Sequence, residues 1–202
     1  MNRMDCIEAA FNWLDEARPI ARDYFRAPLE VLTKRDKSPV TMADLEIERL
    51  LRRHIREEFP SHGIFGEEQD PENPHSDTRW IIDPIDGTRS FVSGSPLFGT
   101  LLALAEDSSI EMGVLDMPVL HERWWASRED GAFHNGRRCS TSEVTDLTQA
   151  MLCCTSPEIF PPELWPRYEL LAQHVKVTRY GVDCFNYGAL ASGWVDVIAE
   201  AT

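Results

Sequence analysis

Two carboxylates and a hydroxyl follow a short apolar segment in the run Asp83-Pro84-Ile85-Asp86-Gly87-Thr88. The apolar residues before them are typical of a strand end. Because Pro84 cannot donate a hydrogen bond to a central ladder, we expect the chain to turn there. Asp83 and Asp86 then converge, and the Ile85 carbonyl offers a third oxygen. Oxygen ligands of this kind suit Mg²⁺, so the pattern predicts Mg²⁺-assisted hydrolysis of a phosphate ester.

A third acid and a helix start add to this candidate site. Glu67 follows Ile64-Phe65-Gly66, which indicates another strand ending at a turn. Gly87 permits close approach of the backbone to a ligand, and Thr88 can cap a helix beginning at Arg89. We therefore expect metal on the acids and phosphate on the backbone N–H groups of Gly87 and Thr88.

Three motifs, in this order along the chain, resemble those of the inositol monophosphatase family: Pro39-Val40-Thr41-Met42-Ala43-Asp44, Gly66-Glu67-Glu68 and Asp83-Pro84-Ile85-Asp86-Gly87-Thr88. The resemblance runs from about residue 5 to the end. The segments 90–100 and 179–184 are similar to the histidinol-phosphate phosphatases of that family. The resemblance implies a metal-dependent, lithium-sensitive phosphomonoesterase that acts on histidinol phosphate in histidine biosynthesis. An inositol or sugar monophosphatase is the alternative, and a nucleotide 3′-phosphatase is third.

The resemblance also implies roles for individual residues. The metal ligands for two or three Mg²⁺ ions are Glu67, Asp83, Ile85 (through its carbonyl) and Asp86. Asp44 and Thr88 orient and deprotonate the attacking water, and no covalent phosphoenzyme is expected. Asp86, Asp183 and Glu200 face the alcohol part of the substrate. Since histidinol phosphate carries an ammonium group, an acid at Asp183 favours it over a neutral polyol.

Several of these residues have a purely structural interpretation. Asp44, in the first turn of a helix, also suits the helix dipole, and Asp183 can cap the helix that begins near Cys184. Glu68 is interpreted as a solvated acid rather than a ligand. Lys37 either orders water near the metal or is an ordinary solvated loop residue.

The helices and strands that must position these residues follow from hydrophobic periodicity. Helical spacing is predicted over 7–25 and again from the N-cap Thr41 to the residues before Pro60. Strands are predicted over 100–105, 110–116, 123–126 and 131–136, followed by alternating strands (150–154, 175–179, 195–199) and helices (163–173, 184–192). The fold class expected is an α+β or α/β layered sandwich with αβαβα layers, as in sugar phosphatases. It comprises an antiparallel sheet with two helices (1–145) and a smaller α/β half (146–202).

By the resemblance, family members continue past Glu200 into a segment whose aspartate binds the second metal, whereas this sequence stops at Thr202. We therefore expect the first metal and phosphate to bind weakly and turnover to be poor or absent. A remnant that only binds phosphorylated metabolites is the non-enzymatic alternative.

Composition limits the partners and the compartment. The formal net charge of −14 over 202 residues argues against nonspecific binding of nucleic acid. The sequence shows neither a signal peptide nor an apolar run of membrane-spanning length, and its five cysteines are odd in number. We expect a cytoplasmic protein with reduced thiols whose partner is a small phosphorylated metabolite. Homodimerisation is expected from the family resemblance alone.

Overall fold

The computed structural model describes residues 3–28, 32–33 and 39–201. Two short 3-10 helices, Leu147–Gln149 and Pro157–Ile159, flank β10. The other elements are α1 (Arg3–Tyr24), β1 (Leu32–Thr33), β2 (Pro39–Val40), α2 (Met42–Glu58), β3 (Gly63–Gly66), β4 (Thr78–Asp86), α3 (Thr88–Ser93), β5 (Gly99–Glu106), β6 (Ser109–Met117), β7 (Glu122–Ser127), β8 (Gly131–His134), β9 (Arg137–Cys139), β10 (Met151–Cys154), α4 (Trp165–His174), β11 (Val177–Tyr180), α5 (Phe185–Ala191) and β12 (Val197–Ile198).

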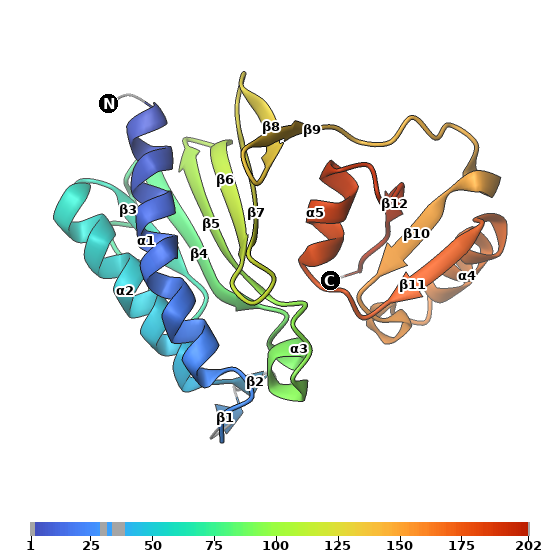
Figure 1. Ribbon diagram of the computed structural model, residues 1–202, viewed down its shortest axis with the longest axis horizontal. Helices are drawn as coiled ribbons and strands as arrows, with labels where there is room; N and C mark the ends of the chain where they lie inside the picture. The colour runs from blue at the N-terminus through green and yellow to red at the C-terminus, as the bar shows by residue number, and fades with distance from the viewer. Residues whose placement is uncertain (1–2, 29–31, 34–38, 202) are drawn as a thin grey trace.

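Helices and sheets alternate across the molecule in five layers (Figure 1). α1 and α2 cover one face of a seven-stranded sheet of order β3-β4-β5-β6-β7-β8-β9. α5 lies between this sheet and a three-stranded sheet of order β11-β10-β12, and α4 covers the other face of the small sheet. The predicted fold class, a layered sandwich of αβαβα type, is confirmed.

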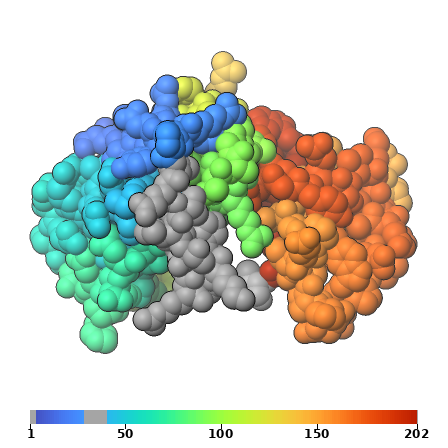
Figure 2. Space-filling view, turned by 90° about the horizontal axis from the view of Figure 1, so that it is seen from below, coloured from blue at the N-terminus to red at the C-terminus, as the bar shows by residue number. Residues whose placement is uncertain are grey.

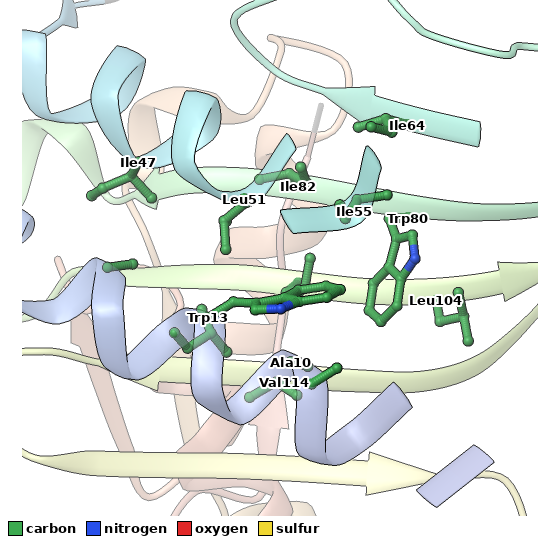
Figure 3. Close-up of a cluster of buried hydrophobic side chains, with 14 of the residues drawn as sticks. Ala10, Trp13, Ile47, Leu51, Ile55, Ile64, Trp80, Ile82, Leu104 and Val114 are labelled. Carbon is green, nitrogen blue, oxygen red and sulfur yellow. The ribbon is translucent and has the colours of Figure 1, made fainter. Parts of the chain in front are cut away.

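The first layer is held by one apolar core (Figure 3). On α1, Ala10 and Trp13 point toward the sheet, and α2 contributes Ile47, Leu51 and Ile55, all essentially inaccessible to solvent. This burial follows from the helical spacing of apolar residues that the sequence shows. α2 starts at the N-cap Thr41, as predicted.

The large sheet is antiparallel except for its first pair, because β3 runs parallel to β4. Contrary to the turn expected at Pro84, β4 continues to Asp86. β3 pairs with β4 only as far as Ile82, so a residue without an N–H is tolerated beyond that point, where β5 alone accompanies the strand. The register shifts between Asp83 and Asp86. A bulge, rather than a strand end, therefore redirects the acids.

The start of α3 also differs from the expectation. Gly87 is the N-cap, with φ at 81°, and Thr88 is the first helical residue rather than the cap. A left-handed residue makes the sharp change from strand to helix, and glycine adopts that conformation without a steric penalty.

In residues 146–202, called the smaller lobe below, apolar side chains pack on both faces of β10. Leu152 and Cys154 face α4 and its Tyr168, whereas Cys153 faces α5, as the alternation of side chains along a strand requires. The predicted boundary between residues 145 and 146 falls in the segment that joins the two sheets, and the division into domains stays a prediction. Within the described ranges, no helix combines the length and apolarity needed to cross a membrane.

Candidate metal and phosphate site

The acids predicted to bind metal gather where β4 loses its second neighbour. The Ile82 carbonyl accepts a hydrogen bond from the Glu67 N–H at 3.2 Å, which brings the end of β3 alongside Asp83. Besides burial, the charge of Glu67 raises the pKa of Asp83, and the charges of Asp86 and Asp44 add to this shift, so all three acids lie close to Asp83. Four acids from three separate segments therefore share one small volume.

Asp83 lies at the centre of this cluster. Its Oδ1 is buried and has no hydrogen-bond partner among the described residues. The pKa of Asp83 is well above its ordinary value because burial removes water from the carboxylate and because Glu67 and Asp86 repel its charge. A divalent cation relieves both effects, since it supplies positive charge and takes a carboxylate oxygen as a ligand. The residues present therefore fit Mg²⁺.

The carbonyl of Ile85 is the remaining predicted ligand. It accepts a hydrogen bond from Thr88 Oγ1 at 3.0 Å, which occupies one of its two lone pairs. In the part of the chain that the structure describes, no three acidic, histidine or cysteine side chains are arranged so that they alone could hold a metal ion. Mg²⁺ does not require such an arrangement, because it is usually held by one or two carboxylates together with water and substrate phosphate.

Asp44 belongs to the cap of α2 and also lies near the acidic cluster. Its Oδ2 accepts hydrogen bonds from the Thr41 N–H at 2.8 Å and from the Thr41 hydroxyl at 2.6 Å, as in a capping box. The side chain is buried, and its charge is among those that raise the pKa of Asp83. The cap thus fixes the carboxylate beside the cluster.

α3 begins directly after the acids and lies at the junction of the two lobes, as seen from below (Figure 2). A Cβ added to Gly87 would lie 3.0 Å from the Asp183 Cβ, so the smaller lobe presses against the start of α3. The Asp183 carboxylate accepts a hydrogen bond from the Ser90 hydroxyl. The N-cap of α5 is Cys184. The side chain of Asp183 therefore bonds to α3 across the two lobes.

A second bond across the lobes ends on Asp86. The Cys184 N–H donates to Asp86 Oδ2 at 2.8 Å. Burial raises the pKa of Asp86, the hydrogen bond from Cys184 opposes this shift, and the charge of Asp183 adds to it. The predicted substrate acids Asp86 and Asp183 are thus brought together.

Glu200 lies two residues after β12 and has its own partners. Its Oε1 accepts hydrogen bonds from the Thr155 N–H at 2.8 Å and from the Thr155 hydroxyl at 3.0 Å. Burial, Glu200 and Asp86 together raise the pKa of Tyr187, so this exposed α5 residue experiences both acids. Lys37 lies outside the described residues.

The sequence analysis missed two buried charged residues that hold the segment carrying Glu67. Glu48 and Arg52, one turn apart on α2, are 0% and 1% exposed and form an ion pair at 2.7 Å. The detectable signal is that Asp44, Glu48 and Arg52 recur every four residues and so lie on one stripe of the helix.

Glu72 extends this ion-pair network and gives it a pH dependence. Hydrogen bonds from Arg56 and then Arg52 lower the pKa of Glu72 to about 2. A carboxyl group with a lowered pKa in the folded state stabilises the fold above its unfolded pKa, and this stabilisation is lost as the pH falls through the folded value. The Glu72→Gln variant should therefore be less stable than wild type at pH 7 by about 1–2 kcal/mol, a figure reduced because the side chain is 34% exposed.

Urea unfolding at pH 7 and near pH 2 checks this prediction. The difference should close between about pH 5 and pH 2. Glu57→Gln, at an exposed position of α2, serves as the control. A difference for Glu72→Gln that stays constant with pH would contradict the prediction.

Comparison with known proteins agrees with this fold. A bifunctional chloroplast phosphatase of Arabidopsis thaliana, IMPL2, is 40% identical over 189 residues, which are 93% of this chain and 55% of that protein. A histidinol-phosphatase of Chlorobaculum parvum is 38% identical over 197 residues, 96% of this chain and 76% of that enzyme. The present chain thus spans little more than half of the Arabidopsis relative.

Solved structures and the family model lead to the same assignment. The structure of an inositol monophosphatase from Zymomonas mobilis is 38% identical, with a TM-score of 0.88, and the match covers 99% of this chain and 78% of that one. The model of the inositol monophosphatase family matches residues 3–202. With nearly the whole sequence matched, the chain belongs to the inositol monophosphatase family.

Proposed function

We propose that this chain carries the active site of a Mg²⁺-dependent phosphomonoesterase that converts histidinol phosphate to histidinol and phosphate. The observation that carries the proposal is the cluster of Glu67, Asp83 and Asp86, in which a buried oxygen of Asp83 has no hydrogen-bond partner from any residue that the structure describes. The relative from Chlorobaculum parvum is named a histidinol-phosphatase, which supports this substrate.

The residues that would hold two or three Mg²⁺ ions are Glu67, Asp83, the Ile85 carbonyl and Asp86. When bound, Mg²⁺ supplies positive charge that polarises the phosphate and brings the pKa of water toward neutrality. We assign the phosphate to the backbone N–H groups of Gly87 and Thr88, at the turn into α3.

Asp44 and Thr88 prepare the attacking water in this proposal. The Thr88 hydroxyl donates its only proton to the Ile85 carbonyl, so its oxygen can only accept a hydrogen bond from the attacking water. Asp44 takes the proton that this water loses as its oxygen attacks phosphorus. The bond between phosphorus and the alcohol oxygen breaks, the leaving alkoxide takes a proton from solvent water to give the alcohol, and Asp44 returns its proton to solvent.

Two acidic residues of the smaller lobe support the proposed preference for histidinol phosphate. Asp183 lies beside Gly87 and Asp86, where its carboxylate can form a charge-assisted bond to the ammonium group of histidinol phosphate. Glu200 is engaged by Thr155, so we assign it a contribution of charge at longer range.

Phosphate release from histidinol phosphate and from inositol 1-phosphate, each with and without Mg²⁺, tests the function. The chain is used in excess over substrate, so that slow turnover is still measured. Mg²⁺-dependent release that is at least tenfold faster from histidinol phosphate is expected. Faster release from inositol 1-phosphate would favour the second candidate, an inositol monophosphatase, which the likeness to the Zymomonas mobilis protein supports. Release from neither substrate would agree with the poor or absent turnover expected from the sequence and would reject both functions for this chain.

The Asp183→Asn variant separates substrate recognition from chemistry. Loss of a hydrogen bond to a charged group costs about 1.5–3 kcal/mol, so kcat/KM for histidinol phosphate should fall about 10- to 100-fold. Release from inositol 1-phosphate should change less than about threefold, because a neutral polyol does not need the charge. Asp70→Asn, at an exposed position, is the control. An equal loss for both substrates would show that Asp183 acts only through its bond to Ser90.

A further inference from the structure

The segment that carries Glu67 is fastened to α2 by a buried carboxylate. Glu48 Oε2 accepts the Glu68 N–H at 2.7 Å, and Glu48 Oε1 accepts the Gln69 N–H at 3.1 Å. Both bonds are made to backbone atoms directly after Glu67. The position of the backbone there is therefore set by one side chain of α2.

Arg52 completes this attachment from the same helix. Its Nε donates to Glu48 Oε1 at 2.7 Å, and its Nη2 donates to the Gln69 carbonyl at 2.8 Å. Its Nη1 donates to Glu72 Oε1 at 2.9 Å. The guanidinium thus neutralises the buried Glu48 and holds the segment at two further points.

Because Gly66 has no side chain, Glu48 and Arg52 can approach the backbone as closely as this attachment requires. A Cβ at this position would lie 2.2 Å from Glu48 Oε1 and 2.8 Å from Arg52 Nη2. Any side chain there would collide with the buried pair. The glycine before Glu67 is thus explained by the approach of Glu48 and Arg52 rather than by the turn.

The arrangement links two parts of the candidate site through one rigid element. Asp44 and Glu48 are one turn apart on α2, so the helix that holds the water-activating acid also holds the segment with a metal ligand. A ligand must be kept within about 0.5 Å of its productive position, and buried hydrogen bonds of this kind provide such precision.

We propose that Glu48 and Arg52 are positioning residues, which preset the segment 67–69 so that Glu67 meets Asp83 before metal binds. This inference rests on the proposed metal site. It assigns to α2, through these two side chains, control over Mg²⁺ affinity.

Two measurements on purified protein test the inference. The first is the hydrogen exchange of the Glu68 and Gln69 amides in metal-free protein, and the second is the Mg²⁺ dissociation constant from calorimetric titration. In Glu48→Gln, exchange of these amides should accelerate at least about tenfold, and Mg²⁺ should bind about 10- to 100-fold more weakly. Arg52→Lys keeps the charge but not the fork of donors, so it should give smaller changes in the same direction in a chain that still folds.

Asp116→Asn is the matched control. Asp116 is also 1% exposed, and it pairs with Arg18 and Arg123 at 2.7 and 2.6 Å. Neither of these ion pairs involves the segment 67–69. The variant should lose stability but keep wild-type exchange at 68 and 69 and wild-type Mg²⁺ affinity.

The outcomes separate this inference from the proposed function. Absence of Mg²⁺ binding by the wild-type protein would overturn the metal site and the inference together. Binding by wild type that Glu48→Gln and Arg52→Lys retain in full would overturn the inference alone. Equal weakening of Mg²⁺ binding in Asp116→Asn would reduce Glu48 and Arg52 to a general contribution to stability and would also overturn it.

Discussion

Replacing Asp83 with asparagine is expected to eliminate Mg²⁺ binding and, at the same time, to stabilise the metal-free protein. The change keeps the shape of the side chain but removes a carboxyl group whose ionised form is destabilised by burial and by the charges of Glu67 and Asp86. Relief of that strain should raise stability by about 1–3 kcal/mol, or the melting temperature by about 2–10 °C for a chain of this size. Phosphate release should fall by about 1,000-fold or more, since a metal ligand is lost.

Calorimetric melting in the presence of a chelator and titration with Mg²⁺ measure the two effects. Asp77→Asn makes the same chemical change at an exposed residue just before β4 and should leave both quantities unchanged. A metal-free Asp83→Asn protein that melts below wild type would mean that the carboxylate stabilises the fold. Retained Mg²⁺ binding would remove Asp83 from the ligands.

The second large effect is expected from Gly188→Ala, where a single methyl group should displace α5. The added Cβ would lie 2.7–2.8 Å from three ring atoms of Trp124. The ring is held in place on two sides. Its centroid lies 4.2 Å from that of the stacked His134 ring, and its Nε1 donates to Ser192 Oγ at 2.8 Å. Overpacking of this kind costs about 1–3 kcal/mol.

The displacement should also reach the candidate site. α5 follows directly on Asp183 and Cys184, which contact Ser90 and Asp86. A shift of about 1 Å in positioning groups lowers rates by up to about 100-fold, so phosphate release should decrease together with the melting temperature.

Gly113→Ala provides the comparison for this prediction. A Cβ on Gly113 would meet no atom within 4 Å, and its backbone is not in the left-handed region. This variant should be as stable as wild type or slightly more stable. Equal melting temperatures for Gly188→Ala and Gly113→Ala would show that α5 tolerates the added methyl group.

Local patterns were sufficient to predict the long elements of this fold. The helical spacing of apolar residues placed α1 and α2, and the apolar runs over 100–105, 110–116 and 123–126 placed β5, β6 and β7. Three acids spaced around predicted strand ends located the candidate metal site. All of these depend on residues close together in the chain.

What the sequence could not reveal depends on neighbours in space. Whether Pro84 ends a strand is decided by where β3 stops, and this is not encoded around Pro84. Glu48 and Arg52 have the spacing of an exposed ion pair on a helix, and only the fold shows that the segment after Gly66 covers them. Asp183 bonds to Ser90, 93 residues away, where local rules predict a helix cap.

Asp86 belongs both to the acidic cluster and to the joint between the lobes. It binds the backbone of Cys184, 98 residues away, and the neighbouring Asp183 binds Ser90. A substitution of Asp86 therefore alters both the candidate metal site and the contact between the lobes. Loss of activity in such a variant does not by itself assign a chemical role to Asp86. A ligand that binds both Asp86 and Asp183 would also connect the two lobes. The increase in melting temperature on ligand binding would therefore report the stabilised contact between the lobes as well as the affinity.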